Sequence, residues 1–374
     1  MKKTLLLLII LVTSVAALAS CGKKYKPVAS TAEESKVVMT FKIDEEEYKI
    51  RYELYRMLFL NNHSLVDNGD TSVWSGENKD EYIKEMDELI VSHAAEIYSV
   101  LHLAEVSGIN PYSKEIDNKI YENIRVSVEG NGSDVLGHGT YEKYLASLKK
   151  EKNMNYSVAV LLMRYALVYD EITALFAGEE HEVFGKLEGA LEYTEEDVKD
   201  YYYGEDSARI LHMFFAKEVK SYEKMCEYQI ALDECDSPEE AASYIMGTFC
   251  PVIDTDIFVN KKVSGITVGK HELDRSQYAE YTDAALSLLP GETSEVLNVR
   301  QDKDYYYIIY KLEKTDEYFK EHYERVEVSY IDNTIGSLIF EVKEELIGSL
   351  DKNEGYSNIN HAQVLDIASE ANAK

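Results

Sequence analysis

The chain of 374 residues contains few of the residue types on which metal and redox sites depend. It has four cysteines and nine histidines. Cys226, Cys235 and Cys250 follow Cys21 without a CxxC or other metal-binding spacing, and no histidines form an HExxH arrangement. We therefore predict no metal site and no cofactor. The three later cysteines leave two states open, one disulfide with a free thiol or three buried thiols.

Basic residues are also scarce. The chain has 39 Lys and Arg against 69 Asp and Glu, which gives a formal net charge of −30. A nucleic-acid partner requires a basic footprint, so we predict no binding to nucleic acid. The acidic balance favours solubility. It leaves open whether the surface attracts basic unfolded polypeptides or is only a solvated surface.

The N-terminus has the pattern of an export signal. Lys2 and Lys3 precede an apolar run from Leu5 to Val12, and the small residues Leu18-Ala19-Ser20 lead into Cys21. This run is too short for a stable membrane-spanning helix, and the pattern is typical of a cleaved signal over residues 1–20. Removing it takes away 20 residues and two lysines, so 354 residues remain and the charge falls from −30 to −32.

The ending Leu-Ala-Ser-Cys resembles the lipobox of bacterial lipoproteins, in which the cysteine is lipidated and becomes the mature N-terminus. The resemblance implies that Cys21 anchors the protein to the extracytoplasmic face of the cell membrane, since two acyl chains hold a protein stably. The alternative is an ordinary secretory signal with an incidental cysteine. We expect residues 21–36 to form a flexible tether, with Lys23, Lys24 and Lys26 facing anionic headgroups.

The mature chain is longer than one hydrophobic core usually supports, so we expect two domains. Residues 37–203 indicate a mainly helical domain. We predict a β-branched strand over 37–43, in a hairpin with 47–50, and after it a long amphipathic helix from Tyr82 to Ala104. Further helices are predicted to begin at the N-caps Ser113, Thr140 and Thr194. The apolar stretch 158–168 predicts a central buried helix.

After Gly204 the pattern changes to short strands and helices. We predict strands at 208–215, 252–259 and 305–312, and helices at 222–232 and 278–289, which together form an α+β domain over 204–316. An apolar stripe from Ile331 to Leu350 predicts a last helix over 317–350 that packs back on the helical domain. The tail, 351–374, is left open between disorder and one last packed turn.

With this order of elements, the chain resembles a known family, the extracytoplasmic foldases of the PrsA and SurA type. In these proteins a parvulin domain is inserted in a helical chaperone domain. The most specific segment is YTDAALSLLPGETSEVL, from Tyr281 to Leu297. It is similar to the parvulin pattern of an aromatic residue, an alanine-containing helix and then Leu-x-Pro-Gly-Glu-x-Ser-x-Val. His212-Met213-Phe214-Phe215 resembles the first parvulin strand. The fold class implied is therefore α+β.

The resemblance implies a peptidyl-prolyl isomerase site. His212 falls on the first of the family's two histidines, and Tyr307 stands where the second is expected. The proline pocket would consist of Tyr281, Phe214 and Gln277, with Gln277 in place of a methionine. The segment from Ser264 to Gly269 lacks the acid expected there. These departures leave isomerase activity open.

Three functions follow. The first is a prolyl isomerase that assists the folding of unfolded or nascent exported polypeptides. The second is a holdase chaperone with a degenerate parvulin scaffold, in which some of the 30 tyrosines contact clients. The third is a solute-binding lipoprotein, which predicts two doubly wound lobes of alternating strands and helices. We favour a membrane-anchored foldase of parvulin architecture.

Overall fold

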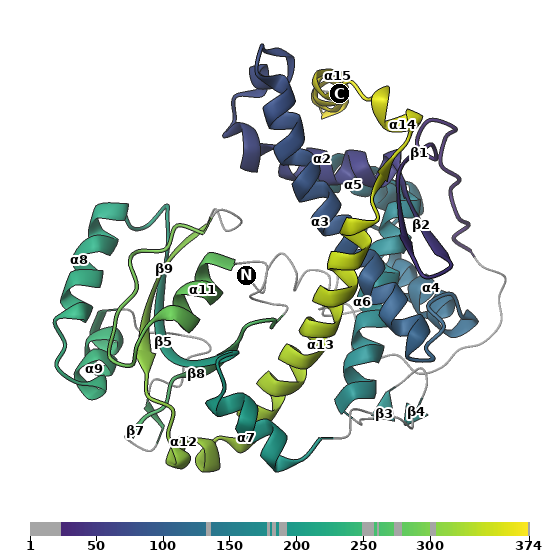
Figure 1. The fold of residues 1–374 in the computed structure, drawn as a ribbon. Helices are drawn as coiled ribbons and strands as arrows, with labels where there is room; N and C mark the ends of the chain where they lie inside the picture. Colours follow the sequence, from purple (N-terminus) through teal and green to yellow (C-terminus); the bar gives the residue numbers. More distant parts are fainter. Residues whose placement is uncertain are drawn as a thin grey trace. The chain divides into compact units, whose positions relative to one another are not determined.

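The computed structural model describes residues 24–131, 136–177, 180–181, 185–186, 193–248, 258–259, 262–272, 279–299 and 304–372. Cys21, Gln277 and most of the strand expected at 252–259 lie outside these residues. Helices and short antiparallel sheets make up the described chain, which confirms the predicted α+β class (Figure 1). Two compact units are present. Unit 1 comprises Met1–Leu175, Glu179–Leu187 and Ile339–Lys374, and unit 2 comprises Phe176–Gly178 and Glu188–Leu338.

Unit 1 is mainly helical. Its helices and short strands are α2 (Tyr52–Asp67), the 3-10 helix η1 (Thr71–Ser75), α3 (Lys79–Val106), α4 (Lys114–Glu129), α5 (Tyr141–Lys152), α6 (Tyr156–Ala177), β3 (Glu180–His181), β4 (Gly185–Lys186), α14 (Glu354–Ser357) and α15 (His361–Asn372).

Local sequence explains where these helices begin. The side chains of Ser113 and Thr140 accept hydrogen bonds from the first turns of α4 and α5, as predicted. The predicted long helix is α3, and Gly108 follows its end with φ +84°. By length and composition α3 could cross a membrane, but 67% of its apolar stretch is buried within the protein, as in the core helix of a soluble domain. From 156 to 176, no residue of α6 is exposed.

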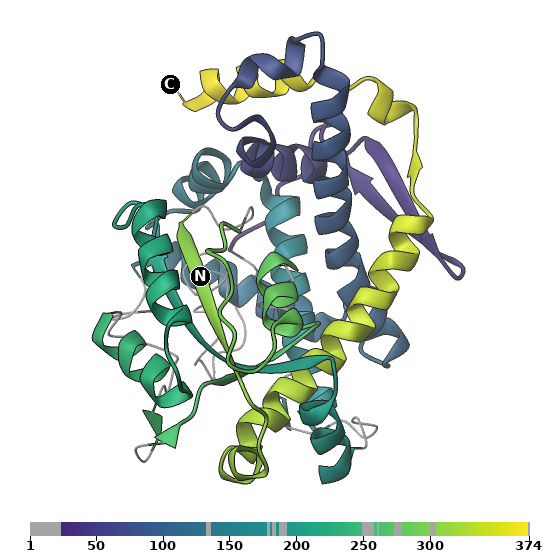
Figure 2. The same ribbon diagram turned by 60° about the vertical axis from the view of Figure 1, so that its left-hand side comes forward.

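The predicted hairpin consists of β1 (Val37–Ile43) and β2 (Glu46–Arg51), which pair antiparallel. The tail of the chain packs onto it. The strand β10 (Asp351–Lys352) pairs with the other edge of β1, so that the sheet order is β10-β1-β2 (Figure 2). The tail, which the sequence left undecided, is therefore ordered as far as its described residues extend.

A buried carboxylate, Asp87 on α3, joins the tail to the helices of unit 1. Its Oδ1 accepts a hydrogen bond of 2.8 Å from Tyr55 on α2, and its Oδ2 accepts one of 2.7 Å from the Lys352 Nζ and another from Tyr356. The Tyr55 hydroxyl also lies 2.8 Å from the Nε2 of His361. Asp87 is 3% exposed. Because several partners surround this buried charge, its desolvation is offset by hydrogen bonds.

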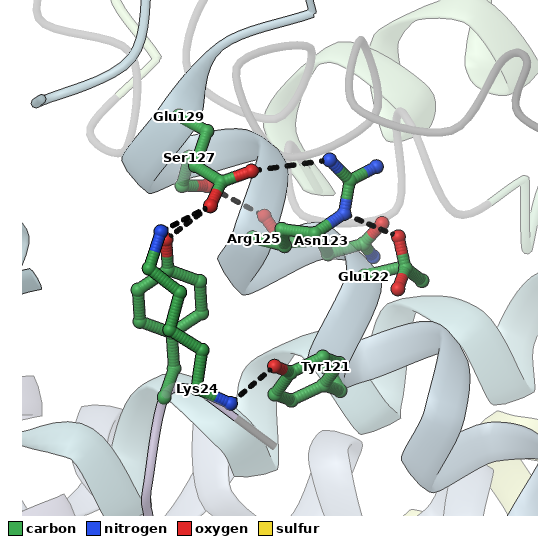
Figure 3. A network of polar contacts seen from close by, with 8 residues as sticks. Lys24, Tyr121, Glu122, Asn123, Arg125, Ser127 and Glu129 are labelled. Atoms are coloured by element: carbon green, nitrogen blue, oxygen red, sulfur yellow. Dashed lines mark hydrogen bonds and ion pairs between the residues drawn. The ribbon is translucent and has the colours of Figure 1, made fainter. Parts of the chain in front are cut away.

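The expectation of a flexible tether over 21–36 is wrong from Lys24 onward (Figure 3). Tyr25 is 5% exposed, and its hydroxyl donates a 2.5 Å hydrogen bond to Glu129 at the end of α4. The Nζ of Lys24 lies 2.8 Å from the same carboxylate, and the backbone N–H of Lys24 donates a hydrogen bond to the Tyr121 hydroxyl. Hydrogen bonds from Lys24 and Tyr25 lower the pKa of Glu129 to about 2. The polar composition of this segment predicted a flexible linker. Composition does not show that a single aromatic residue, Tyr25, is buried against the helices.

Unit 2 contains the sheet that bears the candidate site. Its elements are α7 (Glu195–Tyr203), β5 (Ser207–Ala216), α8 (Tyr222–Asp233), α9 (Pro238–Thr248), β6 (Phe258–Val259), β7 (Lys262–Val263), β8 (Ile266–Gly269), α11 (Ala279–Ser287), β9 (Tyr305–Leu312), α12 (Asp316–Glu321) and α13 (Tyr323–Gly348), the last of which continues into unit 1.

The central sheet has the strand order β8-β5-β9, and both pairings are antiparallel. Side chains alternate between its two faces because successive residues of a strand point to opposite sides. On one face, Leu211 and Met213 pack with residues of α8 and α9. On the other, Ala208 and Ile210 pack with α11. Figure 1 shows the sheet between α8 and α9 on its left and α11 on its right.

The domain boundaries differ from those expected at 203 and 317. Val198 and Tyr202 of α7 pack with Tyr318, Phe319 and Val326, so α7, α12 and the first part of α13 belong to unit 2. Only from Ile339 does α13 belong to unit 1. An apolar stripe shows that one face of a helix is buried, but not which core buries it.

All described strand pairs are antiparallel. Doubly wound lobes are built on mostly parallel sheets. The described residues therefore do not have the architecture that we expect of a solute-binding lipoprotein.

Candidate functional site

The register of β5 and β9 places the predicted site residues on one face of the sheet. His212 is opposite Ile309, and Phe214 is opposite Tyr307. Both belong to the series that begins at Ala208 and Ile210, the face that packs against α11. His212 and Phe214 are two residues apart, so their side chains must share this face.

The first helix turn of α11 places Tyr281 over this face. The Tyr281 hydroxyl lies 2.5 Å from the Nδ1 of His212, and the two residues are 69 positions apart in the chain. Tyr281 is 3% and His212 9% exposed. A buried hydrogen bond of this kind fixes the orientation of both rings, because breaking it would leave a polar atom without a partner away from water.

Aromatic rings complete the cluster. The ring centroids of Tyr281 and Tyr307 lie 5.4 Å apart with an edge-to-face angle of 76°, and those of Phe214 and Tyr307 lie 6.0 Å apart. Phe214 also contacts His212 edge-on, with centroids 5.6 Å apart. Tyr305 packs on Phe214 at the same distance. We name His212, Phe214, Tyr281, Tyr305 and Tyr307 the His212 cluster.

A lysine of the sheet holds α11 in place. The Nζ of Lys311 donates hydrogen bonds of 2.5 Å to the carbonyl of Ala285 and 3.2 Å to that of Leu286, in the last turn of α11. A cation at a helix C-terminus satisfies carbonyls that have no partner within the helix. Burial lowers the pKa of Lys311. Lys311 lies on the same face of β9 as Tyr307, four residues away, so it orients α11 and with it Tyr281.

The turn after α11 returns the chain to the edge of β9. Gly291 has φ +90°, and its N–H donates to the carbonyl of Lys311 at 2.9 Å. Further along, the N–H of Ser294 donates to Ile309, and Leu297 and Tyr307 exchange backbone hydrogen bonds. The segment from Tyr281 to Leu297 thus forms a helix, a Pro-Gly turn and an extended strand-like run, which is what its sequence pattern predicts.

Four predicted site residues therefore come together: His212, Phe214, Tyr281 and Tyr307. Gln277 and Cys21 lie outside the described residues, so their roles stay predictions. Sequence reasoning missed Tyr305 and Lys311. The signal was available, because both share the two-residue period of Tyr307 along β9.

The chemical capacity of the cluster is hydrogen bonding within an apolar setting. Tyrosine and histidine can each donate or accept a hydrogen bond. Phe214 and Tyr305 are half-buried, and Phe214 offers an apolar edge. Within the part of the chain that the structure describes, no three His, Cys, Asp or Glu side chains are placed to share a metal ion.

Unit 2 is thus an α+β module with an antiparallel sheet and a buried His–Tyr pair under one helix. No protein-family model matches the chain, and no curated protein sequence matches it.

Among solved structures, the chain is similar to foldase protein PrsA from Streptococcus pneumoniae str. Canada MDR_19A, at 13% identity, over 85% of this chain and 97% of that one, with a TM-score of 0.27. It is similar to PrsA from Bacillus subtilis at 16% identity, over 72% and 87%, with a TM-score of 0.23. A third is foldase protein PrsA from Lactococcus lactis, at 12% identity, over 88% and 99%, with a TM-score of 0.24.

Proposed function

We propose that the protein is a membrane-anchored extracytoplasmic foldase whose unit 2 binds proline-containing segments of exported polypeptides and accelerates their cis/trans isomerisation. The observation that carries the proposal is the His212–Tyr281 hydrogen bond, which lies beside the aromatic rings of Phe214 and Tyr307. The N-terminal signal pattern and Cys21 support the location and the anchor.

Prolyl isomerisation requires no nucleophile from the protein, because no covalent bond is broken. Rotation about an Xaa-Pro bond faces a barrier of about 18–20 kcal/mol because amide resonance is lost in the twisted state. Catalysis needs an apolar surface for the proline ring, removal of water, and polar groups that stabilise the twisted amide. Phe214 and Tyr307 would supply the apolar surface. Tyr281, oriented by His212, would supply the hydrogen bond.

The test is the rate of cis/trans exchange in a set of Xaa-Pro peptides, measured by NMR with the chain from Gly22 onward. We expect acceleration by the wild type and a loss of about 100- to 1,000-fold in His212→Ala, in line with removal of one hydrogen bond that stabilises a transition state. Tyr310→Phe is the matched control. Tyr310 lies on β9 but packs on the opposite face, so this variant should keep the wild-type rate. Wild type without any acceleration would refute the isomerase proposal.

Burial favours a second candidate function. His212 and Tyr281 are more than nine-tenths buried, which suits a scaffold as well as a reactive site. In that case the protein is a holdase, and it would suppress the aggregation of an unfolded client equally well as wild type and as His212→Ala. Wild type that does not suppress the aggregation would contradict the holdase function. Loss of suppression in His212→Ala alone, with its fold intact by circular dichroism, would contradict the scaffold role of the cluster.

A further inference from the structure

The chain is bound to the surface of unit 1 only three residues after Cys21. A chain spans at most about 3.3–3.6 Å per residue, so the Cα atoms of Cys21 and Lys24 can be no more than about 11 Å apart. This limit holds for any conformation of the two residues between them. A lipid on Cys21 would therefore keep the surface around Lys24 within a short distance of the bilayer.

Several contacts hold the segment Lys24–Lys26, which we name the docked segment. The Tyr25 ring packs against the rings of Tyr121 and Tyr141, with centroids 6.2 and 5.2 Å apart. The Tyr141 hydroxyl, at the first residue of α5, donates a 2.8 Å hydrogen bond to the carbonyl of Lys26. Figure 3 shows the contacts of Lys24 with Glu129 and Tyr121 of α4. The docked segment is therefore bound both to α4 and to the start of α5.

The helix α5 is basic in an acidic chain. It contains four lysines and two glutamates, hence +2 against −30 for the whole chain. Its buried residues are Tyr144 and Leu148. At 100° per residue, Lys143, Lys149 and Lys150 lie on the opposite, exposed side, together with one acid, Glu142.

The docked segment adds two exposed lysines beside this helix. We name the exposed lysines of both elements the basic surface: Lys24, Lys26, Lys143, Lys149 and Lys150. Acidic groups also lie nearby: Glu129 pairs with Lys24, and Glu34 interacts with Lys149.

We propose that the basic surface lies on an anionic lipid membrane, so that the lipid on Cys21 and these lysines together hold unit 1 against the bilayer by its α4–α5 side. The inference rests on the proposed lipid anchor. Each lysine near an anionic bilayer strengthens binding about fivefold. The acidic remainder of the molecule opposes this little, because charges are screened over about 8 Å at physiological salt.

The test places an environment-sensitive dye on the full lipidated chain in vesicles that contain nitroxide-labelled lipid. One variant has the dye at Ala146→Cys, which is exposed between the lysines of α5. The comparison variant has it at Glu88→Cys, exposed on α3. The parent chain without an added cysteine, treated with the same dye, corrects for the native thiols. We expect quenching at position 146 and little at position 88 in vesicles that contain phosphatidylglycerol.

The charge requirement is tested with a triple variant, Lys143→Gln, Lys149→Gln and Lys150→Gln. It should weaken the contrast between the two dye positions, as should vesicles of phosphatidylcholine alone, because only the lipid on Cys21 then keeps this surface near the bilayer. The matched control replaces three exposed lysines of unit 1 outside the basic surface, Lys42→Gln, Lys49→Gln and Lys84→Gln, and should keep the contrast.

Equal quenching at both dye positions in wild type, or a contrast that is undiminished in the triple variant, would overturn the inference. The peptide isomerisation rate, measured in parallel, separates this result from the proposed function, because the substituted lysines lie outside the His212 cluster. An inactive enzyme that shows the contrast leaves the inference standing. Intact mass without a lipid on Cys21 would overturn the inference together with the proposed anchor.

Discussion

At the residue scale, two tyrosines shape the surroundings of His212. The hydroxyl of Tyr281 is the partner of the His212 Nδ1. Tyr307 packs edge-to-face on Tyr281. The cluster thus combines a hydrogen bond between side chains with contacts between aromatic rings.

Tyr281→Phe tests the hydrogen bond while keeping the ring. We expect it to lower the free energy of unfolding by about 1–2 kcal/mol, since a buried histidine loses a hydrogen-bond partner. Urea unfolding measures this change. Tyr310→Phe, buried on the other face of the same sheet, serves as the control and should cost less. Equal costs would mean that the His212–Tyr281 contact adds nothing to stability.

Asp170, in α6, gives a prediction about pH. Burial raises the pKa of its carboxyl from 3.8 to about 6. The folded state therefore binds more protons than the unfolded state between about pH 4 and 6, and stability falls as the pH rises through this window. Asp170→Asn should remove this fall and raise the free energy of unfolding at pH 7 by about 1–3 kcal/mol.

Urea unfolding of the Asp170 variant from pH 4 to pH 7 measures the slope. Glu88→Gln, which removes an exposed carboxylate of α3, should leave the slope as in wild type. An unchanged slope in Asp170→Asn would show that Asp170 titrates normally in the folded protein.

At the element scale, the close approach of α13 to the end of β8 depends on a glycine. A Cβ on Gly336 would lie 1.7 Å from the carbonyl oxygen of His271. On the adjacent turn, the side-chain oxygen of Asn333 accepts a 2.8 Å hydrogen bond from the N–H of His271. The helix and the strand end therefore meet backbone to backbone at this point.

Gly336→Ala should destabilise the protein by more than about 2 kcal/mol, because the clash involves backbone that cannot move aside cheaply. Gly348→Ala is the matched control in the same helix. Nothing lies within 4 Å of its added Cβ, so the better helix propensity of alanine should leave Tm unchanged or raise it. Thermal unfolding followed by circular dichroism compares the two. A Gly336→Ala protein as stable as wild type would show that the contact is looser than described.

At the scale of the whole molecule, two units are joined through α13, and unit 1 is built from both ends of the chain. The docked segment near the N-terminus and the tail from Asp351 both pack within unit 1. Truncation at either end should therefore affect unit 1 before unit 2.

The anchor is tested on the whole protein in cells that export it. Wild type should be found in the membrane fraction, with a mass that shows a lipid on Cys21. Cys21→Ala should be found in the soluble exported fraction, because the proposed anchor places all acyl chains on this one cysteine. His212→Ala should stay with the membrane. Membrane association that is unchanged in Cys21→Ala would contradict the lipid anchor.

Features that depend on near neighbours along the chain could be predicted from the sequence alone. The N-caps Ser113, Thr140 and Thr194 begin helices in the structure, because a capping side chain bonds to backbone only two or three residues away. The dense run of Tyr and Ile over 305–312 likewise specified a strand.

Features that depend on distant contacts became visible only in the folded protein. These features are the hydrogen bond between His212 and Tyr281, the hydrogen bonds from Lys311 to the end of α11, and the division of α13 between the two units. The burial of Tyr25, in a segment with the polar composition of a linker, is another. Each joins residues far apart in the sequence. Secondary-structure propensity does not predict such pairs, because the fold brings together the residues that share a hydrogen bond or bury a ring.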